Sequence, residues 1–157
     1  TDDYIPLPEW RPGSDFYPVE DAAFDMFPIY YTNAANTDSW TVENPWLNEV
    51  NEDDGVTYCI EMNPATAKAK GIESGDEVVI TSTAGYSVEG KVVLNEGIHP
   101  ECLSSVVGTW DCKSKAMSIA FGKGVNLVSL LPGTKAERMD HIVSAFDQLI
   151  RVKIEKK

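Results

Sequence analysis

Residues 63–94 decide the fold of this chain, and they read NPATAKAKGIESGDEVVITSTAGYSVEGKVVL. An asparagine-proline pair opens the stretch as a helix cap and first helical residue, and Gly71 stands where a left-handed residue ends a helix. Apolar residues then mark one strand over 77–83 and a returning strand over 86–94, with an alanine-glycine turn between them. The stretch predicts a short helix over 65–70 followed by a β-hairpin.

Further strands and helices are predicted on both sides of this hairpin. Short apolar runs favour four more strands, over residues 27–32, 57–62, 103–107 and 149–154. A second asparagine-proline pair at Asn44 predicts another short helix, which runs to about Val50. Loops are expected over 33–41, 51–55 and 117–131, and a helix over 137–147. Many short strands with two capped helices between them predict a mainly β fold, a β-barrel with short helical inserts.

The first 26 residues differ in composition from the rest of the chain. They contain four of the nine prolines, with acidic residues between them. Proline restricts both itself and the preceding residue, which favours extended backbone. We therefore expect an extended, Pro-rich linker over 1–26 and a single domain over 27–157.

Charge is distributed unevenly along the chain. The formal net charge is −12, and residues 1–67 hold fourteen acidic side chains and one basic side chain, Arg11. This acidity argues against nucleic-acid binding and against docking on an anionic membrane. No apolar run approaches the ~18 residues that a membrane-spanning helix needs. Residues 112–136, by contrast, hold four lysines and no acid, and would best receive an anionic small ligand.

The sequence shows no catalytic or metal-binding constellation. Its three cysteines are odd in number and lack CxxC spacing, so neither a disulfide framework nor a zinc site is expected. The two histidines, His99 and His141, have no partner at a spacing typical of acid–base or nucleophilic catalysis. We therefore assign no catalytic and no metal-ligating residue.

Several short motifs follow one another in a specific order. They are Pro28-Ile-Tyr-Tyr-Thr32, Asn44-Pro-Trp-Leu-Asn-Glu49, Asn63-Pro-Ala-Thr-Ala67, Ser74-Gly-Asp-Glu-Val78, Val107-Gly-Thr-Trp110 and Gly122-Lys-Gly-Val-Asn126. Each motif is weak alone. The ordered set, over residues 27–157, resembles the C-terminal molybdopterin dinucleotide-binding domain of the DMSO reductase family of molybdenum and tungsten oxidoreductases.

This resemblance implies a fold, a cofactor and partners. Domains of that family fold as a double-psi β-barrel and hold the pterin and guanosine diphosphate arms of molybdopterin guanine dinucleotide, whose molybdenum or tungsten is bound through the pterins. They form the last domain of a large catalytic subunit, so we expect a fragment that is inactive alone. Its implied partners are the remaining domains of that subunit and an iron-sulfur electron-transfer subunit. The location stays open between the cytoplasm and the periplasm of a bacterial or archaeal cell.

Eight residues match positions that the resemblance assigns to cofactor binding: Thr32, Asn33, Ser39, Asn44, Gly108, Trp110, Lys123 and Asn126. An asparagine amide offers both a donor and an acceptor to a pterin edge, and glycine lets backbone N–H groups approach a pyrophosphate. A lysine in the acid-free segment can neutralise phosphate. Asn44 reads equally as a helix cap, and Asn126 reads also as a turn residue.

Two other functions stay open on the sequence alone. A standalone double-psi barrel can act as an interaction or assembly module without a cofactor, because fold alone does not decide function. A small barrel enzyme of the aspartate decarboxylase type needs a self-cleaving Gly-Ser step, and that dipeptide occurs only at Gly13-Ser14, in the linker. A cofactor module is expected to bring Asn33, Gly108 and Asn126 to one rim beside Lys123, which an interaction module has no reason to do.

Overall fold

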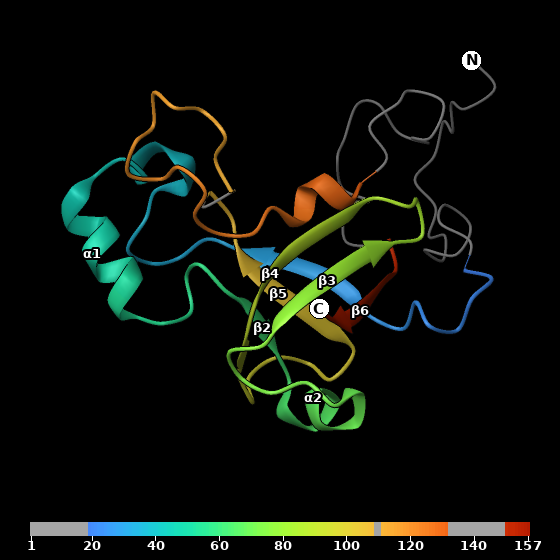
Figure 1. Ribbon diagram of the computed structural model, residues 1–157. Helices are drawn as coiled ribbons and strands as arrows, with labels where there is room; N and C mark the ends of the chain where they lie inside the picture. Colours follow the sequence, from blue (N-terminus) through green and yellow to red (C-terminus); the bar gives the residue numbers. More distant parts are fainter. Residues whose placement is uncertain (1–18, 109–110, 132–149) are drawn as a thin grey trace, which may run out of the picture.

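The computed structural model describes residues 19–108, 111–131 and 150–157 (Figure 1). Its strands are β1 (Phe27–Tyr31), β2 (Ile60–Met62), β3 (Glu77–Ser82), β4 (Ser87–Leu94), β5 (Cys102–Val106) and β6 (Val152–Lys156). Its helices are α1 (Pro45–Asp53) and α2 (Pro64–Lys70), with the short 3-10 helices η2 (Asp38–Thr41) and η3 (Leu127–Leu130). Within the described residues, neither helix is long or apolar enough to cross a membrane.

The six strands form one mixed sheet in the order β1-β5-β2-β4-β3-β6. β1 pairs with β5 and β2 with β4 in parallel, whereas the other three pairings are antiparallel. Met26 comes just before the edge strand β1, and Val152 is the first residue of the other edge strand, β6. These two residues form an isolated antiparallel bridge, with N–H···O bonds of 3.1 and 2.9 Å. The mainly β prediction is confirmed, but in the described residues the sheet is not closed into a barrel.

The stretch that decides the fold forms as its residues predict. The Asn63 side chain accepts a hydrogen bond from the Ala65 backbone N–H at 2.9 Å, and α2 ends at Gly71, whose φ of 69° is left-handed. Gly85, with a φ of 84°, turns the chain between β3 and β4, which pair antiparallel from Glu77 opposite Lys91 to Thr81 opposite Ser87. Cap, stop and turn are local signals, and each one is confirmed.

The bounds of three elements differ from the prediction by more than one residue. α1 continues to Asp53, through residues read as an acidic turn, because Asn51 is buried and hydrogen-bonded to Asn36 rather than solvated. β2 begins only at Ile60, because the Thr57 backbone N–H and hydroxyl bond to the Asp54 carboxylate and hold the preceding residues in a turn. The last strand begins later than predicted, at Val152, and runs to Lys156.

The predicted irregular loop over 117–131 contains one short 3-10 turn, η3. The predicted helix over 137–147 lies outside the described residues, as do residue 149 and most of the predicted linker. Met26, the last residue of that linker, is buried in the core and bonds to Val152.

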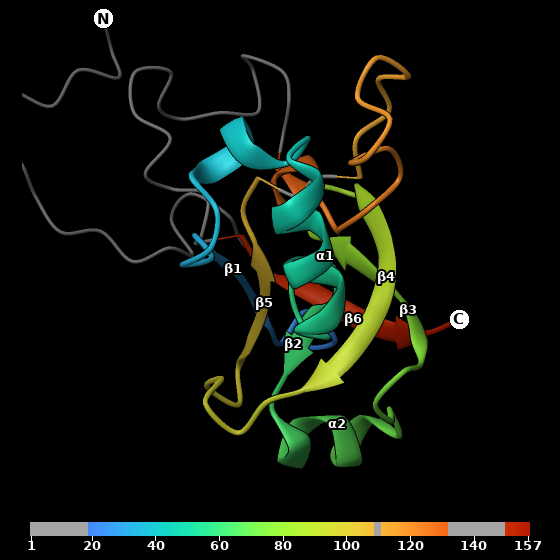
Figure 2. The same ribbon diagram turned by 90° about the vertical axis from the view of Figure 1, so that its left-hand side faces the viewer.

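One hydrophobic core packs against the inner face of the sheet. Its largest fully buried side chains include Met26, Ile60, Met62, Ile80, Leu103 and Leu130. Gly90 in β4 allows the segment after residue 124 to pack closely, because a Cβ built there would lie 2.5 Å from Val125 Cγ2 and 2.9 Å from Ile60 Cδ1. α1 lies at one end of the sheet, with the orange segment before η3 beside it in both views (Figures 1 and 2).

Candidate functional site

The carboxyl ends of β1 and β5 lie side by side, because these strands pair in parallel with Tyr31 opposite Val106. The Val107 N–H donates to the Tyr31 carbonyl at 2.8 Å, which continues the pairing past the strand ends. The chain after β1, which begins with the exposed Thr32, and the buried Gly108 after β5 therefore leave the sheet at one place. Gly108 has a φ of 93°, a left-handed conformation that favours glycine. Trp110 lies outside the described residues.

A buried acidic residue holds the end of β1. Glu61 in β2 is 2% exposed, and its two carboxyl oxygens accept from the Tyr31 hydroxyl and from the Asn95 amide, each at 2.5 Å. Burial and, next, the bond to Glu61 raise the pKa of Tyr31 far above its ordinary value, so Tyr31 remains a hydrogen-bond donor. The residue just before Thr32 is thus fixed from inside the fold.

Asn33 is anchored within the fold by its own amide. Its side-chain oxygen accepts from the Ala35 backbone N–H at 2.8 Å, and its nitrogen donates to the Thr57 hydroxyl at 2.6 Å. Burial tends to raise the pKa of the neighbouring Asp54, but hydrogen bonds from Thr57 and Val56 outweigh it and lower that pKa overall. The turn after β1 is therefore tied to the turn before β2.

The structure settles how Asn44 is used locally. Asn44 is the N-cap of α1, and its side-chain oxygen accepts from the Trp46 and Leu47 backbone N–H groups at 3.0 and 3.3 Å. The cap interpretation is confirmed. Ser39 lies in η2, a few residues earlier, and is half-buried.

A network of amide side chains joins the segment after β1 to α1. Asn36 donates to Asn51 at 2.8 Å, and Asn51 approaches the Tyr58 hydroxyl at 3.5 Å. The Tyr58 hydroxyl in turn donates to Asn48 at 2.9 Å. Asn36, Asn48 and Asn51 are all buried, so each amide needs hydrogen-bond partners within the chain. The sequence prediction missed this network, because buried asparagines on a short helix read as surface residues.

Lys123 reaches this network from the other side. Its ammonium group bonds to Glu52 Oε1 at 2.6 Å and to Asn48 Oδ1 at 2.7 Å, and it lies 5.7 Å from the centre of the Tyr58 ring. The bond from Lys123 is the main reason that the pKa of the Glu52 carboxyl is lowered. Lys123 therefore joins the segment before η3 to α1.

A second carboxylate holds the same segment. Glu43 accepts from the Ile119 N–H at 3.1 Å and from the Ala120 N–H at 2.7 Å. These residues are 76 and 77 positions apart in the sequence, so no local pattern could have indicated the contact.

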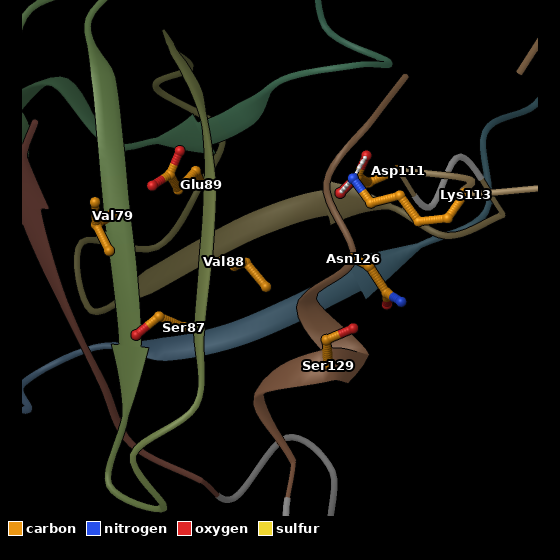
Figure 3. A pocket seen from close by; sticks show the side chains of 8 residues that line it. All are labelled: Val79, Ser87, Val88, Glu89, Asp111, Lys113, Asn126 and Ser129. Atoms are coloured by element: carbon orange, nitrogen blue, oxygen red, sulfur yellow. Dashed lines mark hydrogen bonds and ion pairs between the residues drawn. The ribbon is translucent and has the colours of Figure 1, made fainter. Parts of the chain in front are cut away.

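Asn126 lies at the start of η3, where its side-chain oxygen accepts from the Val128 N–H at 3.1 Å. The residue also lines a pocket of about 490 Å³ between η3 and the β3–β4 hairpin (Figure 3). The hairpin supplies one wall, and an ion pair of 2.6 Å between Lys113 and Asp111 lies on the opposite side. The full lining is Val79, Ser87, Val88, Glu89, Asp111, Lys113, Asn126 and Ser129.

The predicted residues thus fall into two groups. Thr32, Asn33 and Gly108 lie at the adjoining ends of β1 and β5, and Lys123 is bound to α1 nearby. Asn126 lines the pocket beside the β3–β4 hairpin. The 3-10 helix η3, which Asn126 caps, contacts both β1 and β4. In the described part of the chain, no three His, Cys, Asp or Glu side chains gather where they could hold a metal ion.

The sequence pattern of the family described as "Molydopterin dinucleotide binding domain" matches residues 29–140. The chain belongs to this family. The match confirms the predicted resemblance to the dinucleotide-binding domain of the DMSO reductase family, and with it the predicted cofactor, molybdopterin guanine dinucleotide.

Two curated relatives are about equally similar to the chain. It is 31% identical over 130 residues to the thiosulfate reductase molybdopterin-containing subunit PhsA of Salmonella typhimurium, covering 80% of this chain and 16% of PhsA. It is 31% identical over 113 residues to the arsenate respiratory reductase molybdopterin-containing subunit ArrA of Chrysiogenes arsenatis, covering 69% of this chain and 13% of ArrA. The chain therefore spans only a small part of the length of either relative.

A solved structure shares the fold. Acetylene hydratase from Pelobacter acetylenicus superposes with a TM-score of 0.63 at 14% identity, covering 98% of this chain and 22% of that protein. At this level of identity the likeness concerns the fold alone.

Proposed function

We propose that this chain holds the pterin and guanosine diphosphate arms of molybdopterin guanine dinucleotide in the catalytic subunit of a molybdopterin oxidoreductase. The observation that carries the proposal is the parallel pairing of β1 with β5, which brings the segment after Tyr31 beside Gly108 in a domain of a dinucleotide-binding family. When bound, the metal and its pterins supply the redox chemistry. This chain binds and orients the cofactor, and it is inactive alone.

The local backbone and the side-chain amides fit such a ligand. Gly108 and Gly124 have positive φ, at 93 and 79°, so backbone N–H groups beside them can face a pyrophosphate without a side chain between them, whereas the Gly122 N–H already donates to the Cys112 carbonyl at 2.9 Å. The bond by which Asn126 caps η3 uses its side-chain oxygen, which accepts from the Val128 N–H. Its amide nitrogen can donate to an acceptor on a pterin edge.

The eight proposed cofactor residues differ in how they can serve the site. They are Thr32, Asn33, Ser39, Asn44, Gly108, Trp110, Lys123 and Asn126. Four of these side chains, those of Asn33, Asn44, Lys123 and Asn126, are already hydrogen-bonded within the chain. They therefore act on the cofactor partly by fixing the shape of the segments that surround it.

We propose further that the sheet closes into a double-psi barrel in the complete subunit. The support is the bridge between Met26 and Val152, which already joins the chain beside one edge strand to the other edge strand. Extension of that bridge into a ladder would pair β1 with β6 and remove both open edges.

The remaining domains of the catalytic subunit are the proposed partners of this chain. Trp40 and Trp46 are 88 and 78% exposed, on η2 and α1 respectively. Large aromatic side chains that are this exposed are typical of surfaces that another domain covers. The second proposed partner, an electron-transfer subunit with iron-sulfur clusters, rests on the family resemblance alone.

The native polypeptide that carries this sequence tests the proposal. Its intact mass, its molybdenum and tungsten content and the guanine nucleotide released on denaturation should be measured together. We expect a chain several times longer than this one, with stoichiometric metal and nucleotide. A native chain of about this length that contains neither metal nor nucleotide would favour the alternative, an interaction or assembly module without a cofactor.

A further inference from the structure

One face of α1 and the residue before its cap hold the backbone from residue 119 to residue 123. Glu43 accepts from the Ile119 and Ala120 N–H groups at 3.1 and 2.7 Å. Asn48 and Glu52, one helical turn apart, accept from the Lys123 ammonium group at 2.7 and 2.6 Å. We call Glu43, Asn48 and Glu52 the loop clamp. Glu43, before the helix, and Asn48 and Glu52, on the helix, thus bind the two ends of a five-residue segment.

The clamp engages two of the three N–H donors of the Lys123 ammonium group. These two go to Glu52 and Asn48, while the face of the Tyr58 ring lies 5.7 Å away. A phosphate would have to share this ammonium group with Glu52 and Asn48 or displace one of them. The side chain is 30% exposed, so much of its charge is already shielded from solvent.

The clamp is itself held in place by buried groups. Asn48 is 8% exposed and accepts from the Tyr58 hydroxyl at 2.9 Å. Tyr58 also approaches Asn51, which is 2% exposed and bonded to Asn36. The α1 face cannot turn away from the loop without leaving several buried amides without partners, which is costly. An ion pair on such a fixed base orders a loop better than a solvated surface pair.

We propose that the loop clamp positions the segment 111–126, and that Lys123 serves the cofactor site by locking this segment to α1 rather than by contacting phosphate. Lys123 and Glu52 are thus positioning residues. The segment that they lock begins three residues after Gly108 and ends at Asn126. The clamp follows from the contacts within this chain, and its effect on the dinucleotide rests on the proposed function.

The test uses the full-length subunit that carries this chain, with charge changes at the two ends of the ion pair. The variants are Glu52→Lys, Lys123→Glu and the double exchange of both, together with the milder Glu52→Gln. Glu49→Gln is the matched control, because Glu49 is exposed on the same helix. Two quantities are measured for each protein. They are the hydrogen exchange of peptides that cover 117–124, and the guanine nucleotide and metal bound per chain.

Both single charge reversals should speed exchange over 117–124 by about fivefold, the upper end of the effect of a half-exposed ion pair, and should lower cofactor content. Glu52→Gln should act in the same direction but less, and Glu49→Gln should leave both quantities unchanged. The double exchange rebuilds the ion pair with its charges reversed. It should restore slow exchange and cofactor content together.

Two results would overturn the proposal. Wild-type exchange in both single variants would show that the clamp does not order the loop. The double variant could instead regain slow exchange but not its cofactor content. That result would show that the positive charge of Lys123 itself binds the phosphate. If the wild-type subunit contained no dinucleotide, the proposed function would fail, while the exchange data would still decide whether the clamp exists.

Discussion

Tyr31→Phe tests whether a bond inside the sheet fixes the start of the site. The substitution removes only a hydroxyl, whose partner is the carboxyl group of Glu61 at 2.5 Å. Glu61 is 2% exposed, so water cannot easily replace the lost donor, and Asn95 is left to hold the carboxyl group. Leaving a buried polar atom with a missing partner costs ~1–3 kcal/mol. We expect Tyr31→Phe to destabilise the fold by about 2 kcal/mol.

The assay is thermal or urea unfolding, compared with Tyr86→Phe as the matched control. Tyr86 loses the same hydroxyl at the β3–β4 turn and is 37% exposed, close to the 41% of Tyr31, so the comparison isolates the bond from Tyr31 to the buried Glu61. For a chain of this length, ~2 kcal/mol corresponds to a fall in Tm of roughly 4–8 °C, whereas the control should change by less than ~0.5 kcal/mol. Equal stability of the two variants would refute the reasoning, because it would mean that Glu61 does not depend on Tyr31.

Three further predictions follow from other contacts. Gly90→Ala should destabilise the fold by ~1–3 kcal/mol in an unfolding assay, because its Cβ would lie 2.5 Å from Val125 Cγ2, and the cost should fall in a Val125→Ala background. The pKa of Glu52 is lowered in the folded state. Its contribution to the stability of the fold is therefore present above its ordinary pKa of 4.5 and is lost as pH falls below that value. Thermal unfolding from neutral to acid pH should show this loss, and Glu52→Gln should show less of it. Asn126→Ala should lower the guanine nucleotide and metal bound per chain, while Tm changes little. Full cofactor content in the variant would count against the proposed role.

The parts of the fold that the sequence predicted are those decided by neighbouring residues. Asn63 caps α2, Gly71 ends it and Gly85 turns the hairpin, and each acts within a few residues of its own position. The same holds for Asn44, whose motif predicts the start of α1. Such signals are readable because the bond partner is the backbone next to the side chain.

The parts that could not be predicted depend on partners far away in the sequence. Lys123 was expected to be free for phosphate, since no acid lies near it in the chain. The fold instead brings it 2.6 Å from Glu52, a residue 71 positions away. The α1 boundary was misjudged for a related reason, because Asn51 is polar but its partner, Asn36, is supplied by another segment. Polarity in a sequence does not reveal whether the partner is water or a buried amide.

The same contacts change what a substitution at the site can reveal. Asn33 and Asn44 each bond to the chain itself, so replacing either one perturbs a turn or a helix before it affects any ligand. Gly108 is different, because its φ of 93° makes any side chain strain the backbone. Loss of cofactor in variants of these three residues would therefore be expected even if none of them touched it. Asn126 is more informative, because its amide nitrogen is not needed for the cap of η3, and a change limited to that nitrogen separates binding from folding. Asn126→Asp keeps the oxygen that accepts from Val128 and removes the donor, so retained stability with lost dinucleotide would assign the contact to this side chain.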